Sequence, residues 1–556
     1  MATPQNRSST GHKKFMTNFF ALGKDAKFAA TFGMNLFLVF ACQAARTQSF
    51  LFLQSTAQNE QAETHLERGL EMAQAGELQP AENEFRTAAK LKPNDAEILS
   101  SLATVLAIEK KLEESTTLFE RSLKLNPRDV RSRRHLAANL YQLRRYSEAK
   151  QNLKIVLKAE PNDPQARLLL GLVSENTGDY ATAVSMLASF PALPSGQPEA
   201  AIALARSYYR IGDARKAANC LHALASGPLG LQGALLGAQV ADDMRDFATA
   251  ESLVNGVPAD SPSFGSAQYR LAIVKFHTKQ YRESERILQG LIDTGKRNGE
   301  ILRLLAWCYH NRNRDEDAIR TFREAVQMDP TEERNYLDLG ALLLEERKFS
   351  AASELANRTV NAFPASANAL VLLGSVEFAS ERFTDAAKTY SRALGIDRSN
   401  VEAILGLAKA QAAAGMGREA KATLEEAMKK FPGKASFELE LALLLLKEND
   451  EKSNSQVRAE HLLGAAAKHD PMLAEAQSQL GELALRRGQT AVALTYLENA
   501  VRLSPDSARA HFALARGYRR AGRVEEAARE TGVYEKLKKE DTSGTTSPSS
   551  NAPPGD

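Results

Sequence analysis

The sequence predicts an all-α protein built as a solenoid of stacked antiparallel helix hairpins, and two spacings carry this prediction. A small residue recurs along the 556-residue chain every 34 positions, with single departures of 33 and 39. Its positions are Ala81, Ser115, Ala149, Ala183, Ala217, Ala250, Ser284, Ala318, Ala352, Ala386, Ala420, Ala459, Ala493 and Ala527. A second Gly or Ala lies 12 residues before most of them, from Gly69 to Ala515. A fixed period of this length indicates repeated supersecondary units.

Each repeat reads as a helix, a tight turn and a second helix. In the unit from 299 to 332, Leu302, Leu305 and Tyr309 surround the small residue Ala306 at helical spacing. A polar stretch ends this first helix, and the second carries Ala318, Phe322 and Ala325 on one face before Pro330 closes the unit. The small residues are expected where the two helices of a hairpin approach most closely.

These positions resemble the tetratricopeptide repeat, whose pattern is a large residue, Leu-Gly or Leu-Ala, an aromatic, then Ala, a large residue, Ala and Pro. A closing proline recurs at Pro93, Pro127, Pro161, Pro330, Pro364, Pro432, Pro471 and Pro505. The resemblance implies a right-handed superhelix of about fourteen hairpins over residues 62–540. It weakens over 187–296, where irregular connections are expected, and a polar insertion at 449–455 is expected as a surface loop.

Residues 1–57 form a leader that does not follow the repeat. An apolar run covers residues 28–41 and extends to 45, after the basic residues Lys24 and Lys27. The shorter run has the length of a signal-peptide core, and the longer one allows a single N-terminal membrane anchor. Cleavage, lipidation at Cys42, retention, and a later start at Met16 or Met34 all stay open. The basic flank favours export or membrane anchoring with the repeats on the translocated side; the alternative is a cytoplasmic protein.

The composition indicates no catalytic chemistry. The net charge of +3 gives no sign of nucleic-acid binding, and the three cysteines form no CxxC pair. The nine histidines are scattered, and the chain has neither a P-loop nor a GxSxG motif. We therefore expect no enzyme, no cofactor and no metal site, and small-molecule ligands are disfavoured. Residues 541–556, rich in Ser, Thr, Pro and Gly, are predicted to be a disordered tail.

The resemblance implies that the first helix of each hairpin lines a concave groove. Mapped onto this sequence, the groove positions give patches in which Arg lies beside aromatic residues, a combination that anchors protein interfaces. The candidate partner contacts are Arg131, Arg134, Tyr141, Arg206, Tyr209, Arg210, Tyr269, Phe276, His277, Arg303, Trp307, His310, Arg509, Phe512, Arg516, Arg519 and Arg520. The alternative for each is an ordinary solvated or inter-repeat role.

The function expected from this resemblance is a non-catalytic scaffold that binds segments of partner proteins and serves assembly of a complex. The alternative is a repeat protein that binds a cell-envelope polysaccharide by stacking sugar rings on aromatic side chains. The single tryptophan, Trp307, gives this alternative little support.

Overall fold

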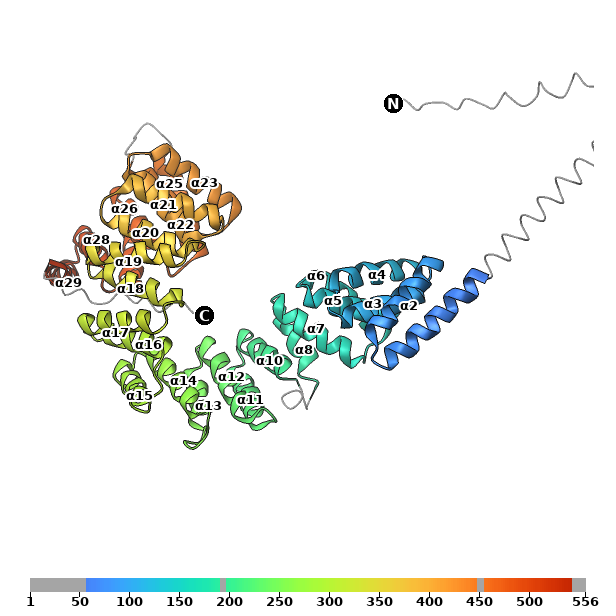
Figure 1. Ribbon diagram of the computed structural model, residues 1–556. Helices are drawn as coiled ribbons and strands as arrows, with labels where there is room; N and C mark the ends of the chain where they lie inside the picture. The colour runs from blue at the N-terminus through green and yellow to red at the C-terminus, as the bar shows by residue number, and fades with distance from the viewer. Residues whose placement is uncertain (1–56, 191–196, 448–454, 543–556) are drawn as a thin grey trace, which may run out of the picture. The chain divides into compact units, whose positions relative to one another are not determined.

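The computed structural model describes residues 57–190, 197–447 and 455–542, which are helices joined by short connections (Figure 1). No strand occurs in these ranges. The chain divides into two compact units, Met1–Ala223 and Leu224–Asp556, and each is described by itself. The predicted all-α solenoid is confirmed, because consecutive helices pair as antiparallel hairpins along both units.

The first unit begins with a helix over 57–74. The helices that follow are α2 (Leu78–Leu91), α3 (Ala96–Ile108), α4 (Leu112–Leu125), α5 (Val130–Gln142), α6 (Tyr146–Ala159), α7 (Pro164–Asn176), α8 (Tyr180–Leu187) and α10 (Pro198–Arg210). Helix α11 (Ala214–Ser226) crosses the boundary between the units.

The second unit continues the same alternation. Its helices are α12 (Gly230–Asp243), α13 (Phe247–Asn255), α14 (Phe264–His277), α15 (Tyr281–Asp293), α16 (Gly299–His310), α17 (Asp315–Met328), α18 (Glu333–Glu345), α19 (Phe349–Ala362), α20 (Ala367–Ala379), α21 (Phe383–Ile396), α22 (Val401–Ala413), α23 (Gly417–Lys430), α24 (Ala435–Lys447), α25 (Ser455–His469), α26 (Ala474–Arg486), α27 (Thr490–Leu503), α28 (Ala508–Arg520) and α29 (Val524–Thr542).

Local sequence signals fix where the two helices of a hairpin start and stop. Many first helices begin with a side-chain cap; Asp129 and Asp163, for example, accept hydrogen bonds from the backbone N–H groups of Ser132 and Ala166. The turn inside a hairpin places one residue at positive φ, such as Gly178 at 75° and Glu381 at 61°. Local sequence signals therefore set both the start and the end of the first helix of a hairpin.

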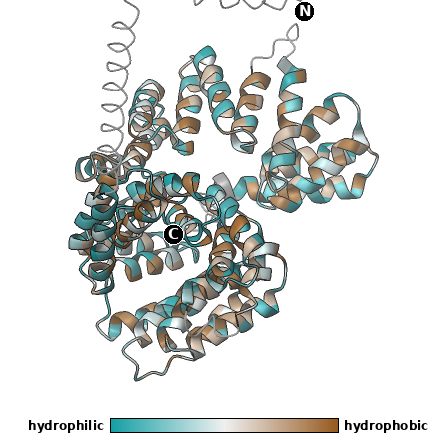
Figure 2. Ribbon diagram, turned by 90° about the vertical axis from the view of Figure 1, so that its right-hand side faces the viewer, coloured by the Kyte–Doolittle hydropathy of each residue, from teal (hydrophilic) through white to brown (hydrophobic). Residues whose placement is uncertain are grey.

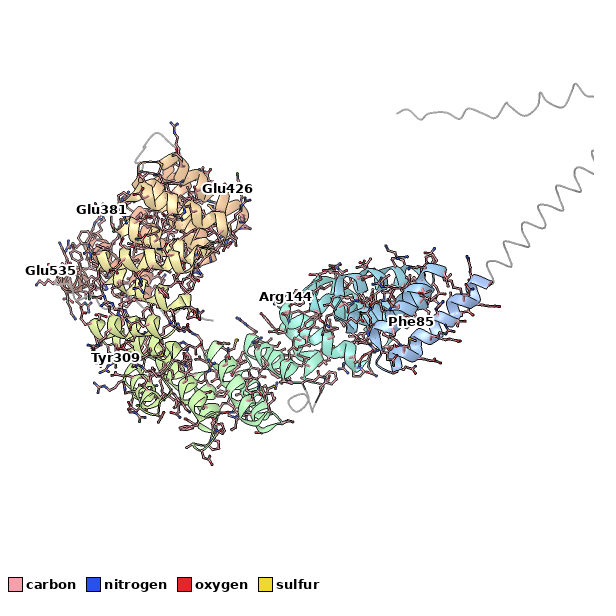
Figure 3. All side chains as sticks on the ribbon, viewed as in Figure 1. Phe85, Arg144, Tyr309, Glu381, Glu426 and Glu535 are labelled. Atoms are coloured by element: carbon pink, nitrogen blue, oxygen red, sulfur yellow. The ribbon has the colours of Figure 1, made fainter. Side chains whose placement is uncertain are left out.

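The small residues lie where the helices of a hairpin touch. Gly171 on α7 faces Leu187 on α8 so closely that a Cβ at Gly171 would lie 2.4 Å from the Leu187 Cγ. Gly481 has the same relation to Leu497 on α27, at 2.5 Å. The large residue fills the space that the missing side chain leaves, as Phe85 does at 1 % exposure (Figure 3). The glycines are therefore packing requirements.

Two of the register positions carry serine instead of alanine, and hydrogen bonds explain both. The buried hydroxyls of Ser115 and Ser284 each donate to the backbone carbonyl 12 residues earlier, at 2.6 and 2.7 Å. Each oxygen then accepts from the next hairpin: from Asn139 Nδ2 at 2.8 Å and from Cys308 Sγ at 3.3 Å. These serines link successive hairpins as well as the helices within one.

Hydrophobic and hydrophilic residues alternate on the helices (Figure 2). Charged residues such as Glu426 and Glu535 lie at the surface (Figure 3). In the described part of the chain, no helix combines the length and the apolar character needed to cross a bilayer. The predicted apolar segment 28–45 and the leader 1–57 fall outside the described residues, apart from residue 57.

One shortened second helix lies inside the predicted irregular region 187–296, and another ends where that region begins. Helix α8 has 8 residues and α13 has 9, whereas most others have 13 or 14. The predicted insertion at 449–455 lies outside the described residues except for Ser455, where α25 begins. Helix α29 runs to Thr542, so the predicted tail begins with two helical residues.

Candidate partner-binding groove

Three cavities of the second unit are lined mainly by the first helices of its hairpins. We call the surface formed by α12, α14, α16, α18, α20, α22, α24, α26 and α28 the groove face. It arises because the first helix of one hairpin packs against the first helix of the next, as α18, α20 and α22 do. Three cavities open on it, and each is described below.

The aromatic cavity has a volume of about 490 Å³ and opens between α12, α14, α16 and the start of α18. It is lined by Asp242, Asp243, Tyr269, Arg270, Ile273, Phe276, His277, Glu300, Arg303, Leu304, Trp307, Glu332 and Arg334. Five of the six groove residues predicted for this region line it. The exception is His310, which is 5 % exposed. Its Nδ1 lies 2.7 Å from Asp315 Oδ1 within its own hairpin, and its Nε2 lies 3.6 Å from Glu345 Oε2 on α18.

Trp307 forms part of the wall and is only 6 % exposed. Its ring packs edge-on against Phe322, with centroids 5.4 Å apart. Its Nε1 donates to Asp338 Oδ2 on α18 at 3.2 Å, and Arg303 donates to the same oxygen at 3.3 Å. The tryptophan therefore joins two hairpins and presents little surface to a ligand.

Asp338 is the acceptor that holds this wall in place. Burial raises the pKa of its carboxyl group, while Arg303 and the Trp307 N–H oppose that rise by stabilising the charged form. A comparable link joins α14 to α12, where His277 Nδ1 lies 2.8 Å from Asp242 Oδ1. Phe276, at 5 % exposure, is also part of the wall.

The acidic cavity adjoins the aromatic cavity and has a volume of about 1030 Å³. Both cavities are lined by Arg303, Glu332 and Arg334. The other residues that line the acidic cavity are Glu333, Leu337, Asp338, Ala341, Leu344, Asn368, Val371, Leu372, Ser375, Asn400, Val401 and Glu402. Its four carboxylates outnumber its two guanidinium groups. Because they share these three residues, the two cavities lie next to each other on the groove face, from α12 to α22.

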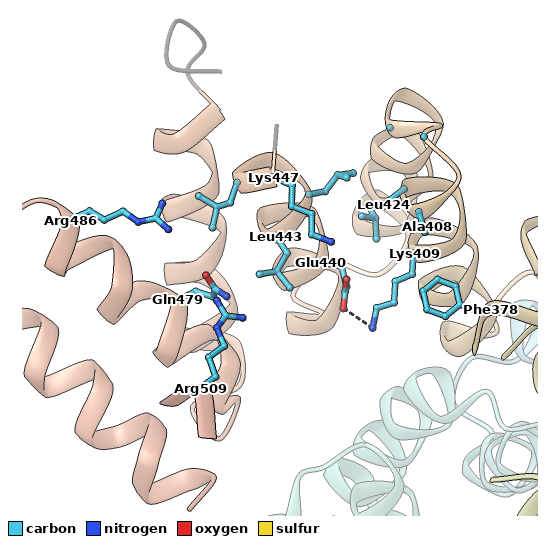
Figure 4. Close-up of a pocket in the computed structure, with 16 residues that line it drawn as sticks. Phe378, Ala408, Lys409, Leu424, Glu440, Leu443, Lys447, Gln479, Arg486 and Arg509 are labelled. Carbon is cyan, nitrogen blue, oxygen red and sulfur yellow. Dashed lines mark ion pairs between the residues drawn. The ribbon is translucent and has the colours of Figure 1, made fainter. Parts of the chain in front are cut away.

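The C-terminal cavity has a volume of about 730 Å³ (Figure 4). Its apolar part is lined by Phe378, Ala408, Ala412, Ala413, Gly415, Gly417, Leu424, Leu443, Leu444 and Leu446, and its polar part by Lys409, Glu440, Lys447, Gln479, Arg486 and Arg509. Lys409 pairs with Glu440 at 2.8 Å. Only Arg509 of this set was predicted from the sequence.

The other predicted residues of the last hairpin have different neighbours. Phe512 is 43 % exposed and lies against Tyr534 of α29, with Arg516 above its ring at 5.9 Å. Arg519 donates to Thr531 Oγ1 on α29 at 2.9 Å, and Arg520 donates to the Leu485 carbonyl. Arg519 therefore links the two helices of its own hairpin, and its predicted contact with a partner stays a prediction.

In the first unit, the predicted residues gather around two carboxylates on α7 and α10. Tyr141 donates to Glu199 Oε1 at 2.7 Å. Arg206 Nη1 lies 3.9 Å from Glu175 Oε1. Burial raises the pKa of Glu175, and the charges of Arg206 and Arg210 oppose this.

The remaining predicted residues of the first unit show both surface and structural roles. Arg210 and Arg131 are exposed, and Tyr209 is half-buried. Arg134 forms an ion pair with Asp163, the cap of α7. That partner gives Arg134 a structural role between hairpins.

No cluster of three metal-binding side chains occurs among the residues that the structure describes. The two described cysteines are separate and free, and burial raises the pKa of Cys220 to about 11 and that of Cys308 to about 12. Such thiols are poor nucleophiles because the thiolate is the reactive form.

The sequence matches the tetratricopeptide-repeat family over residues 135–198, 269–333, 337–401, 377–439 and 478–532. These matches together cover more than half of the chain, and the repeats described above show the same hairpins. The chain belongs to the tetratricopeptide-repeat family.

Two solved structures are similar in fold. The crystal structure of yeast Tom70 is 15% identical, with 87% of this chain and 97% of that chain covered and a TM-score of 0.41. The crystal structure of the APC/C hetero-tetramer Cut9-Hcn1 is 16% identical, with 81% and 88% covered and a TM-score of 0.35. Neither likeness bears on the function of this chain. Comparison with curated proteins gives no match.

Proposed function

We propose that this protein is a non-catalytic scaffold that binds segments of partner proteins along the groove face of its second unit. The observation that carries the proposal is the pair of adjoining cavities, the aromatic and the acidic cavity, with volumes of about 490 and 1030 Å³. Aromatic and arginine side chains beside apolar surface are the groups that anchor protein interfaces. Helices fixed by packing bind without much loss of conformational entropy.

Two side chains that line the acidic cavity and take no part in the hydrogen bonds of Asp338 suit a test, and both pack at the edge of the hydrophobic core. Leu337 and Val371 are half-buried and face the acidic cavity from α18 and α20. Replacing both with Arg fills the cavity with bulk and charge while leaving the Asp338 contacts intact. The matched control is Ile396→Arg, at a 47 % exposed position on the second helix α21.

The experiment is quantitative affinity purification of full-length protein from its native source, followed by mass spectrometry. We expect the Leu337→Arg/Val371→Arg variant to lose its specific partners while its far-ultraviolet circular dichroism stays unchanged. The Ile396→Arg control should keep them. Equal recovery of partners by both variants would refute the groove as the binding site, and binding to a glycan array without protein partners would favour the polysaccharide alternative.

We also propose that the leader exports or anchors the protein. The support is the apolar run 28–45 with its preceding lysines, a pattern typical of signal peptides and single anchors. Membrane and soluble fractions should be compared for the full chain and for a chain lacking residues 1–45. Identical distribution of both in the cytoplasm would contradict the proposal.

A further inference from the structure

The C-terminal cavity exists because one hairpin lacks a large side chain that its neighbours have. Four residues after the small residue of the first helix, α20 carries Phe378 and α24 carries Leu446, but α22 carries Ala412. Ala413 at the end of α22, Gly415 in the turn and Gly417 at the start of α23 continue the gap. The result is a cavity of about 730 Å³ with Phe378 and Leu446 among its walls, a volume typical of pockets that take up organic ligands or buried side chains.

The polar lining of this cavity is mostly basic. Lys409, Lys447, Arg486 and Arg509 face a single carboxylate, Glu440. Figure 4 shows these basic groups around Leu443. The lining therefore combines an apolar floor with an excess of positive charge.

Two of the four basic groups have partners within the protein. Lys409 pairs with Glu440 at 2.8 Å, and Arg509 lies 2.9 Å from Glu475. Lys447 and Arg486 form no ion pair or hydrogen bond with any residue that the structure describes. Two cations beside the cavity are thus available to a ligand.

We infer that the C-terminal cavity binds an acidic segment of a partner protein, with one large apolar side chain of that segment seated over Ala412. Carboxylates next to this side chain meet Lys447 and Arg486, and Arg forms paired hydrogen bonds with carboxylates. This inference rests on the proposed function and names the partner chemistry at one end of the groove face.

The charge of the neighbouring cavity restricts the segment to this end. The acidic cavity presents Glu332, Glu333, Asp338 and Glu402 and repels a ligand rich in carboxylates. An acidic segment therefore binds along α22, α24 and α26, and like-charge repulsion keeps it from sliding towards α18.

The test uses full-length protein and fluorescein-labelled synthetic peptides with one central leucine and flanking positions randomised as Asp/Glu, Ser or Lys. Fluorescence polarisation should show the tightest binding for the Asp/Glu pool, weakened by added salt. Replacing the central leucine with serine should weaken it further. Equal affinity for the acidic and basic pools would overturn the inference.

Two variants locate the binding. Ala412→Phe fills the cavity with the side chain that the equivalent position of α20 already carries, and we expect a loss of about tenfold or more in affinity. Ala412→Ser keeps the cavity and should bind normally, and circular dichroism of both checks folding. Unchanged binding by a folded Ala412→Phe variant would contradict the inference.

A second pair tests the charges. Lys447→Glu/Arg486→Glu should abolish the preference for the acidic pool, whereas Lys468→Glu, at an exposed position on the second helix α25, should not. Retention of the preference by the double variant would overturn the assignment. Partner proteins retained by the Ala412→Phe and Lys447→Glu/Arg486→Glu variants, with no effect of Ala412→Phe on peptide binding, would refute this inference and leave the proposed function intact. Loss of partners only in the Leu337→Arg/Val371→Arg variant would likewise refute the acidic-segment inference and support the groove face as the binding site.

Discussion

The close crossing of α7 and α8 gives a sharp prediction: Gly171→Ala should destabilise the protein even though alanine favours helices. The new Cβ would lie 2.4 Å from the Leu187 Cγ and 2.5 Å from its Cδ2. Carbon atoms in contact normally lie about 3.5–4.0 Å apart, so the helices must separate by more than 1 Å or Leu187 must change rotamer. Overpacking of this kind costs about 1–3 kcal/mol, which exceeds the gain of about 0.5–1 kcal/mol in helix propensity.

Gly464 on α25 is the matched control. It is exposed within a helix, and a Cβ there would have no neighbour within 4 Å. Gly464→Ala should therefore stabilise its helix by about 0.5–1 kcal/mol, because only the propensity term remains. The two substitutions are chemically identical and should have opposite signs.

Hydrogen exchange measured by mass spectrometry suits this comparison, because long repeat arrays need not unfold in one step. Peptides from α7 and α8 should exchange faster in Gly171→Ala, and those from α25 more slowly in Gly464→Ala. Adding Leu187→Ala to Gly171→Ala should relieve the clash and show non-additivity. Slower exchange of α7 in the single Gly171→Ala variant would refute the close-crossing argument.

The remaining predictions concern stability and reactivity. Lys111 and Arg86 outweigh the effect of burial and lower the pKa of Glu82 to about 2, so Glu82→Gln should destabilise the first unit at neutral pH by roughly 2–3 kcal/mol. The depressed pKa adds stability above pH 4.5 that is lost as the pH falls to about 2; pH-dependent urea unfolding should show this, and a pH-independent difference would contradict it. Burial raises the pKa of Cys308 from 9.0 to about 12; iodoacetamide should therefore label it only after unfolding, and rapid labelling of the native protein would disprove the packing. Ala318, which is 0 % exposed, should not tolerate leucine, with Ala318→Leu costing about 1–3 kcal/mol in thermal or urea unfolding; a neutral result would refute the repeat register.

The repeat register was predictable because packing at a hairpin crossing selects residues by size alone. At positions 171 and 481 the opposite helix leaves no room for a Cβ, so the sequence carries Gly there. Asp, Gly and Pro set the ends of helices through interactions with neighbouring residues, so the helix ends could also be predicted from the sequence. The right-handed sense of the solenoid stays a prediction of the resemblance.

The role of each candidate contact was less predictable, because a groove position does not fix what a side chain pairs with. Trp307 lines the aromatic cavity as expected, but its bond to Asp338, 31 residues later, buries it. Arg134 and Arg519 find partners in neighbouring helices, and His310 turns into its own hairpin. These pairings depend on distances between individual side chains, within and between hairpins, which the period alone does not give.

The sequence signal for the C-terminal cavity is a pair of small residues, and not an aromatic or arginine patch. Ala412 and Ala413 occupy positions where α24 has Leu446 and Lys447. The same register that identified the repeat shows this deficit when the positions are compared between units. A repeat position that carries a smaller side chain than its equivalents in the neighbouring hairpins indicates where a solenoid can bind a ligand, as does a position with a different chemical group.

Site-specific photocrosslinking can show whether partner proteins bind on the groove face. A benzoylphenylalanine placed at Ala341, exposed in the acidic cavity, is compared with one at Ala422, exposed on the second helix α23. In native extracts of full-length protein, we expect discrete crosslinked partners from position 341 and none from position 422. Crosslinks to the same partners from position 422 alone would contradict it.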